Sequence, residues 1–185
     1  EARLVKLEAM MLDDVEALVC QRLGVKSVPP MIGRLIREKS EGHPFFAEEL
    51  AYALRESGIL IIEDQVCKIH SRFLNFEDLT LPDTLQAAIT NRIDGLNPSQ
   101  QLTLKVASVI GRIFSFRVLE AVHPIEADRQ ALPNYMETLT RLSLTLIESE
   151  APDLAYIFKH AVTQEVAYNL MLYSQRRQLH QAVAE

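Results

Sequence analysis

The chain has 185 residues, of which 48% are hydrophobic and 24% charged, a balance typical of a globular protein and not of a disordered one. Its net charge of −6 offers no electrostatic attraction for nucleic acid, and no apolar run approaches the roughly 20 residues that cross a bilayer. The N-terminus lacks the apolar core of a signal peptide, so we expect a cytoplasmic protein with Cys20 and Cys67 reduced and buried.

Helical periodicity dominates the first third of the chain. A helix is expected over 11–23, a second begins at Pro30, and a third covers 45–57. Two short apolar runs within 59–69 flank a polar tip, which predicts a β-hairpin. The segment 70–80 has no clear period, and we interpret it as a linker between two domains.

The second half predicts several short helices and then a hairpin. Helices are expected over 85–94, 98–110 and 116–123, with a longer one over 128–142. Two strand-like runs within 144–158 follow them. Helices followed by a two-stranded hairpin are the order of a winged helix-turn-helix, which permits DNA binding without establishing it.

The apolar period changes from that of a strand to that of a helix at His160. The first turn of a helix has unpaired N–H groups and a dipole that favours an anion, so a cation-capable ring beside it suits a phosphate. The alternative interpretation is that His160 only caps the helix or packs beside Tyr156.

Catalytic motifs are missing from the sequence. It contains no G-x-x-x-x-G-K-[ST], G-x-G-x-x-G, C-x-x-C, H-E-x-x-H or G-x-S-x-G pattern, and its five histidines share no metal-ligand spacing. We interpret the acid pairs Asp13–Asp14 and Glu48–Glu49 as solvated helix faces. The chain by itself is therefore expected to catalyse nothing and to hold no metal.

A series of stretches resembles, in the same order, the STAND-class P-loop ATPases found with bacterial class III adenylate and guanylate cyclases, kinases and LuxR-type regulators. These stretches are Lys39–Leu50, Leu81–Gln86, Asn91–Leu96, Lys105–Phe114, Phe158–Tyr168 and Arg176–His180. The first reads K-S-E-G-H-P-F-F-A-E-E-L, with His43 where asparagine is usual in the family.

The resemblance implies a mainly α fold and a fragment of a longer protein. Residues 1–75 would be a helical lid with a β-hairpin, and 80–172 a winged-helix domain with a small β wing. Residues 173–185 would begin a C-terminal helical repeat region. The implied partners are an upstream P-loop nucleotide-binding domain, the downstream repeats and a second copy of the chain upon activation, with neither nucleic acid nor membrane among them.

The resemblance also implies nucleotide-binding residues. Gly42 and Pro44 match the lid motif that lies against the adenine, and His160 matches the winged-helix histidine that reaches the β-phosphate of ADP. Ala161 replaces the aspartate that follows this histidine in plant relatives. ADP or ATP with Mg²⁺ would be the cofactor of the full-length protein, while the isolated fragment is expected to hold none.

The function implied is a nucleotide-state sensor that closes over ADP or ATP bound to the upstream domain. One alternative is a DNA-binding winged helix, whose recognition helix 128–142 would carry Arg129 and Arg141 on a nearly neutral face. Another is a protein–protein assembly scaffold. Phe45 and Phe46 are expected to lie in the core rather than at an interface.

Overall fold

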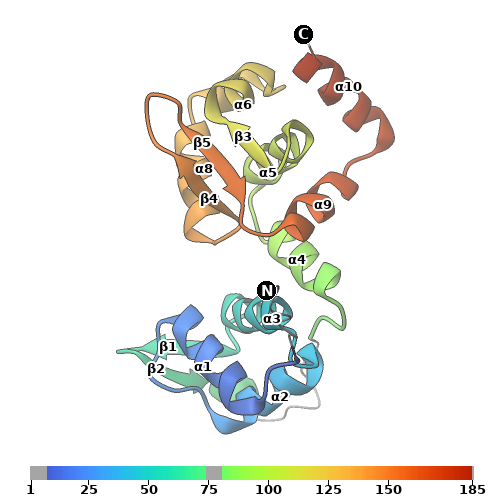
Figure 1. Cartoon of the computed structure of the whole chain (residues 1–185). Helices are drawn as coiled ribbons and strands as arrows, with labels where there is room; N and C mark the ends of the chain where they lie inside the picture. Colours follow the sequence, from blue (N-terminus) through green and yellow to red (C-terminus); the bar gives the residue numbers. More distant parts are fainter. Residues whose placement is uncertain (1–7, 74–80, 185) are drawn as a thin grey trace, which may run out of the picture. The chain divides into compact units, whose positions relative to one another are not determined.

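The computed structural model describes residues 8–73 and 81–184 and divides the chain into two compact units, Glu1–Ala88 and Ile89–Glu185 (Figure 1). The described residues are mainly helical with two small antiparallel sheets, as the sequence predicts. The expected linker over 70–80 lies outside the described residues from residue 74 onward. No helix in the described part of the chain combines the length and apolarity needed to span a bilayer.

The first unit is built mainly from three α-helices and a hairpin, which a short 3-10 helix, η1 (Ser71–Phe73), follows. They are α1 (Leu12–Leu23), α2 (Pro30–Ser40), α3 (Pro44–Glu56), β1 (Leu60–Glu63) and β2 (Val66–Ile69). The two strands pair antiparallel, with Glu63 opposite Val66 at the turn.

Local chemistry sets these boundaries. Pro30 and Pro44 are the first residues of α2 and α3, where the missing N–H group costs no hydrogen bond. Helix α1 ends at Gly24, whose φ of 69° lies in the left-handed region that glycine enters without strain. Asp64 and Gln65 both have positive φ, as a type I′ hairpin turn requires.

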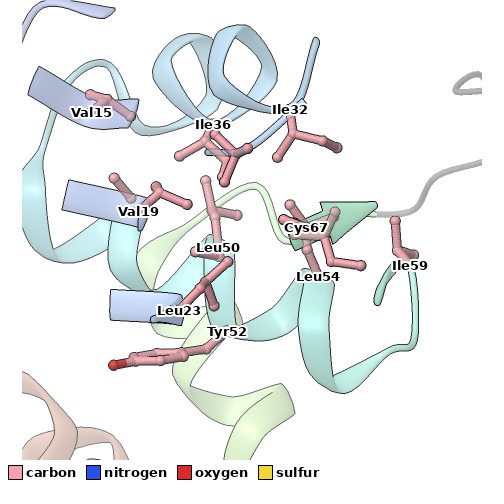
Figure 2. Packing of buried hydrophobic residues seen from close by; sticks show 14 of the residues in the cluster. Val15, Val19, Leu23, Ile32, Ile36, Leu50, Tyr52, Leu54, Ile59 and Cys67 are labelled. Atoms are coloured by element: carbon pink, nitrogen blue, oxygen red, sulfur yellow. The ribbon is translucent and has the colours of Figure 1, made fainter. Parts of the chain in front are cut away.

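Apolar side chains from all three helices and the hairpin converge on one core in this unit (Figure 2). Val19, Ile36, Leu50 and Leu54 have no exposed surface, and each residue of this size stabilises the fold by roughly 1.5–3 kcal/mol when fully buried. Phe46 belongs to the same cluster, and Phe45 is buried as well, which confirms the prediction of a core role for the pair.

The prediction that Glu48 and Glu49 are solvated is wrong. Their exposed fractions are 4% and 3%. Residues 45–52 are all buried, so this part of α3 has no solvated face. Glu48 Oε1 accepts a hydrogen bond of 2.8 Å from Arg22 Nε, which ties α3 to α1. Asp13 and Asp14 are exposed, in agreement with the prediction.

Both cysteines of the chain are free thiols in the first unit. Cys67 is buried in the core, whereas Cys20 is only half-buried and so departs from the expectation for a buried pair. Burial raises the pKa of both thiols, and their mutual proximity adds to the rise at Cys67. Both groups are therefore held as neutral thiols well into the alkaline range.

The second unit is built around a three-stranded sheet and short helices. Its helices are α4 (Leu85–Asp94), α5 (Pro98–Ile110), α6 (Phe116–Val122), α7 (Glu126–Arg129), α8 (Leu132–Arg141), α9 (Ala161–Asn169) and α10 (Tyr173–Ala184). The first turn of α4 belongs to the first unit. Its strands are β3 (Ile113–Ser115), β4 (Thr145–Ser149) and β5 (Ala155–Phe158), arranged in the order β3-β5-β4 (Figure 1).

Aromatic rings join this sheet to the core of the second unit. The ring centroid of Phe114 lies 5.9 Å from that of Tyr156 and 5.6 Å from that of Phe158. All three side chains are buried, and burial raises the pKa of the Tyr156 hydroxyl. The strand that ends at Phe158 is therefore anchored immediately before His160.

The structure of this unit differs from the sequence prediction at two elements. The strand β3 was not expected, because three residues give too short a run to show a period. The helix expected over 128–142 is two helices, α7 and α8, with Pro133 in the first turn of α8, where a missing N–H group costs nothing. In α6, Leu119 alone is buried, and Val118 is 37% exposed.

Candidate functional site

Gly42 and Pro44 lie in the tight turn between α2 and α3. Helix α2 ends at Ser40, and Glu41 and Gly42 follow with φ values of 51° and 74°. The buried Ser40 side chain accepts a hydrogen bond from Gly42 N at 3.3 Å, and Ser40 O accepts one from His43 N at 2.8 Å. The turn is thereby fixed at both ends, and Pro44 begins α3 with its ring exposed.

Gly42 is also the contact point of the segment that leads into α1. Met10 N donates a hydrogen bond of 3.0 Å to Gly42 O. A Cβ on Gly42 would lie 2.6 Å from Met10 O and 2.9 Å from Met10 N, closer than side chains pack against backbone. The position therefore needs glycine both for its positive φ and for the close approach of this segment.

His43 caps helix α3 through its side chain. It is the N-cap residue of α3, and its Nδ1 accepts a hydrogen bond from Phe46 N at 3.3 Å. A ring nitrogen accepts only when it carries no proton, so the cap belongs to the neutral ring. The cap thus helps to hold the backbone that presents Pro44.

We expect His43→Ala to destabilise the first unit by about 1 kcal/mol, because the cap hydrogen bond is lost. His43→Asn should be at least as stable as the native chain, since asparagine is among the best N-cap residues. Urea unfolding at neutral pH checks both variants. Equal stability of His43→Ala and the native chain would show that the ring does not act as a cap.

His160 lies at the junction of β5 and α9, as the change of period predicts. It is the N-cap residue of α9 by its backbone, with φ −129° and ψ 139°, and its carbonyl accepts from Thr163 N at 3.1 Å. Its side chain makes no capping hydrogen bond to the first turn and is half-buried. The interpretation of the imidazole as a helix cap is therefore wrong.

Neighbouring contacts hold this junction in place. Lys159 N donates to Leu144 O at 3.2 Å, which extends the pairing of β4 and β5 up to His160. On the helix side, Gln164 Nε2 donates to Ser108 O at 3.0 Å and ties α9 to α5. The start of α9 is thus fixed from two directions.

The structure brings together only two of the three predicted nucleotide-binding residues. Gly42 and Pro44 share one turn in the first unit, whereas His160 belongs to the second unit. The distance between His160 and that turn is not determined by the fold of either unit. Within the described residues, no group of three or more histidine, cysteine or acidic side chains is arranged to hold a metal ion.

Sequence reasoning missed the structural role of Arg92. This residue of α4 is 4% exposed, and its Nη2 donates to the carbonyl of Leu142, the C-cap residue of α8. A cation at a helix C-terminus also complements the helix dipole. The signal available was its place within the family-like stretch Asn91–Leu96, which by itself says nothing about its partner.

Comparison with known proteins gives limited similarity. Residues 13–68, which span α1 to β2 in the first unit, match the family model described as a domain of unknown function (DUF8739). Adenylate cyclase type 10 of Oryctolagus cuniculus is 22% identical over 186 residues, and the match covers 80% of this chain and 11% of that relative. The chain thus spans only a small part of the relative's length. No solved structure matches the chain significantly.

Proposed function

We propose that this chain is a nucleotide-state-sensing module, a helical lid followed by a winged-helix domain, of a STAND-type signalling ATPase. It would close over ADP or ATP bound, with Mg²⁺, to an upstream P-loop domain, and would itself contribute binding and not catalysis. The observation that carries this proposal is the placement of His160 as the N-cap residue of α9, directly after strand β5.

The topology of the second unit supports the winged-helix part of the proposal. The elements follow the order α5, β3, α6, α7, α8, β4, β5, in which the helices precede a two-stranded wing. Strand β5 lies between β3 and β4 in the sheet, so the wing is continuous with the first strand. The similarity to an adenylate cyclase is consistent with a module that regulates a nucleotide cyclase, which we include in the proposal.

The first unit supports the lid part. Pro44 offers an exposed apolar ring at the start of a helix, a surface suited to the face of an adenine. Gly42 positions that ring through its hydrogen bond with Met10, in the segment that leads into α1. A movement of this segment would thus be transmitted directly to the Gly42–Pro44 turn.

The mechanism would be a switch between two arrangements of the domains. With ADP bound, His160 would donate to the β-phosphate and hold the winged helix closed. Exchange for ATP, prompted by a signal at the downstream repeats, would break this contact and release the winged helix for self-association. A hydrogen bond to a charged group contributes roughly 1.5–3 kcal/mol, which shifts a balanced equilibrium by one to two orders of magnitude.

DNA binding has less support than this switch. Helix α8, the counterpart of a recognition helix, carries one acid and one base, Glu137 and Arg141. Arg129 belongs to α7, and its guanidinium donates to the carbonyls of Ala121 and His123. The basic surface that phosphate contacts need is therefore not formed by α8.

We expect His160→Ala to release ADP from the full-length protein about 10–100 times faster, because the charge-assisted contact is lost. The measurement is the dissociation rate of a fluorescent ADP analogue after a chase with unlabelled ADP. The same variant should raise the basal output of the protein. His180→Ala is the matched control, since His180 is exposed and its Nε2 pairs with Tyr168 far from the start of α9. An ADP dissociation rate and basal output that stay unchanged in His160→Ala would refute the proposal.

A further inference from the structure

A groove of about 660 Å³ opens within the second unit, and its lining does not include His160. Its walls come from α5, from the end of α6 and from α10. The larger aliphatic side chains of the lining are those of Leu102, Val122, Met171 and Leu179. This volume lies within the range of roughly 300–1,000 Å³ that is usual for small-molecule sites.

One wall of the groove is held by a network of hydrogen bonds at the corner after α6. His123 has no exposed surface, and its Nδ1 lies 3.2 Å from Ile125 O. A carbonyl oxygen only accepts, so Nδ1 carries the proton in this arrangement. The other ring nitrogen lies 3.3 Å from Thr103 Oγ1 of α5, which fixes the corner against that helix.

The same corner fixes the guanidinium of Arg129. Its Nε and Nη2 donate to His123 O at 3.3 Å and 3.1 Å, and Nη2 also lies 3.4 Å from Ala121 O. Three carbonyl contacts leave this long side chain little freedom, so its charge is preorganised at the groove. A preorganised cation loses less entropy when a ligand binds.

The groove is positively charged although the chain as a whole is acidic. Its lining includes Lys105 and Arg129, both half-buried, and no aspartate or glutamate. Among the described residues, no carboxylate forms a salt bridge with either cation. The remaining polar lining consists of His123 and of three glutamines, which can donate or accept: Gln101, Gln175 and Gln178. The groove therefore complements an anion with an apolar body.

We propose that this groove binds a small amphipathic anion, with its apolar body against Leu102, Val122 and Leu179 and its carboxylate or phosphate head near Lys105 and Arg129. Because α10 forms one wall, an occupant would tie α10 to α5 and α6. The groove would thus give the second unit a ligand input that is separate from the nucleotide. This inference does not depend on the proposed ATPase role.

The test is binding of decanoate and decyl phosphate to the 185-residue chain. Calorimetry and changes in the amide chemical shifts of α5 and α10 measure the binding. We expect at least one of these anions to bind with a Kd below about 1 mM, and decanol, the uncharged analogue, to bind at least about tenfold more weakly. The better of the two anions identifies the head group. Lys105→Gln should weaken the binding of that anion about tenfold.

Two variants separate the groove from other surfaces. Ala182→Trp places a bulky ring over the groove from an exposed position of α10 and should abolish binding. Lys68→Gln removes an exposed lysine of the hairpin in the first unit and should leave binding unchanged. Failure of both anions to bind, or binding that Ala182→Trp leaves intact, would refute the inference. Binding of an acidic helical peptide in place of both anions would also refute it.

Discussion

Gly42→Ala is expected to destabilise the first unit by about 2–4 kcal/mol. A left-handed backbone costs a residue with a Cβ roughly 1–2 kcal/mol, and Gly42 has a φ of 74°. The new Cβ would also lie within 3 Å of the backbone of Met10, so the segment that leads into α1 must shift. That shift breaks the hydrogen bond between Met10 N and Gly42 O, which contributes roughly 1 kcal/mol.

Gly58→Ala is the matched control for this variant. Gly58 has a φ of 73°, close to that of Gly42, but a Cβ there would meet nothing within 4 Å. Its substitution should therefore cost only the backbone term of about 1–2 kcal/mol. The difference between the two variants measures the contact with Met10 directly.

Amide hydrogen exchange of the first unit is the appropriate measurement, because it reports the stability of each unit separately. Protection of α1 to α3 should fall more in Gly42→Ala than in Gly58→Ala, while α5 to α9 stay unchanged. Equal losses in the two variants would show that the close approach of Met10 to Gly42 contributes nothing.

Arg92→Ala is expected to destabilise the second unit by about 2–4 kcal/mol. The variant removes a buried, charge-assisted hydrogen bond to Leu142 O at the C-terminal end of α8 and leaves a cavity beneath that helix. Arg92→Lys should recover only part of the loss, because an ammonium group lacks the planar fork of the guanidinium.

Arg117→Ala is the control for Arg92, since Arg117 is an exposed arginine of α6 and its loss should change stability by less than about 0.5 kcal/mol. Hydrogen exchange should show weaker protection of α8 and β4 in Arg92→Ala, while α1 to α3 stay unchanged. Native-like protection of α8 in this variant would mean that Arg92 does not hold the helix end.

Together the Gly42 and Arg92 variants test the division of the chain, since each perturbs one unit and leaves the other as its internal reference. The functional prediction at His160 is independent of both. It concerns nucleotide release from the full-length protein, whereas these variants concern folding of the described units.

The helix boundaries were largely predictable because they depend on neighbouring residues. Pro30 and Pro44 fix φ at helix starts, Gly24 ends α1, and Asn97 caps α5 through Gln100 N at 2.9 Å. The junction at His160 was predictable for the same reason, since the change of period marks where a strand gives way to a helix. The positions of all three site residues in their turns thus follow from local sequence.

Which side chains are buried was not predictable in the same way. Glu48 and Arg92 are charged residues on helices, and the sequence pattern of each is that of an exposed face. Each can be buried because it forms a hydrogen bond with a residue from a distant part of the chain, Glu48 with Arg22 and Arg92 with Leu142. The sequence pattern contains no sign of such partners, because the pairing depends on how separate helices pack.

The sequence by itself determined where most elements of this protein begin and end and where the Gly42–Pro44 turn and His160 lie. The tertiary structure alone decided that the His160 ring is not a helix cap and that Lys105 and Arg129 line one groove. The physical reason is the separation along the chain of the residues that interact. Backbone conformation is set by residues a few positions apart, whereas burial and the joining of charges depend on contacts between segments that are remote along the chain.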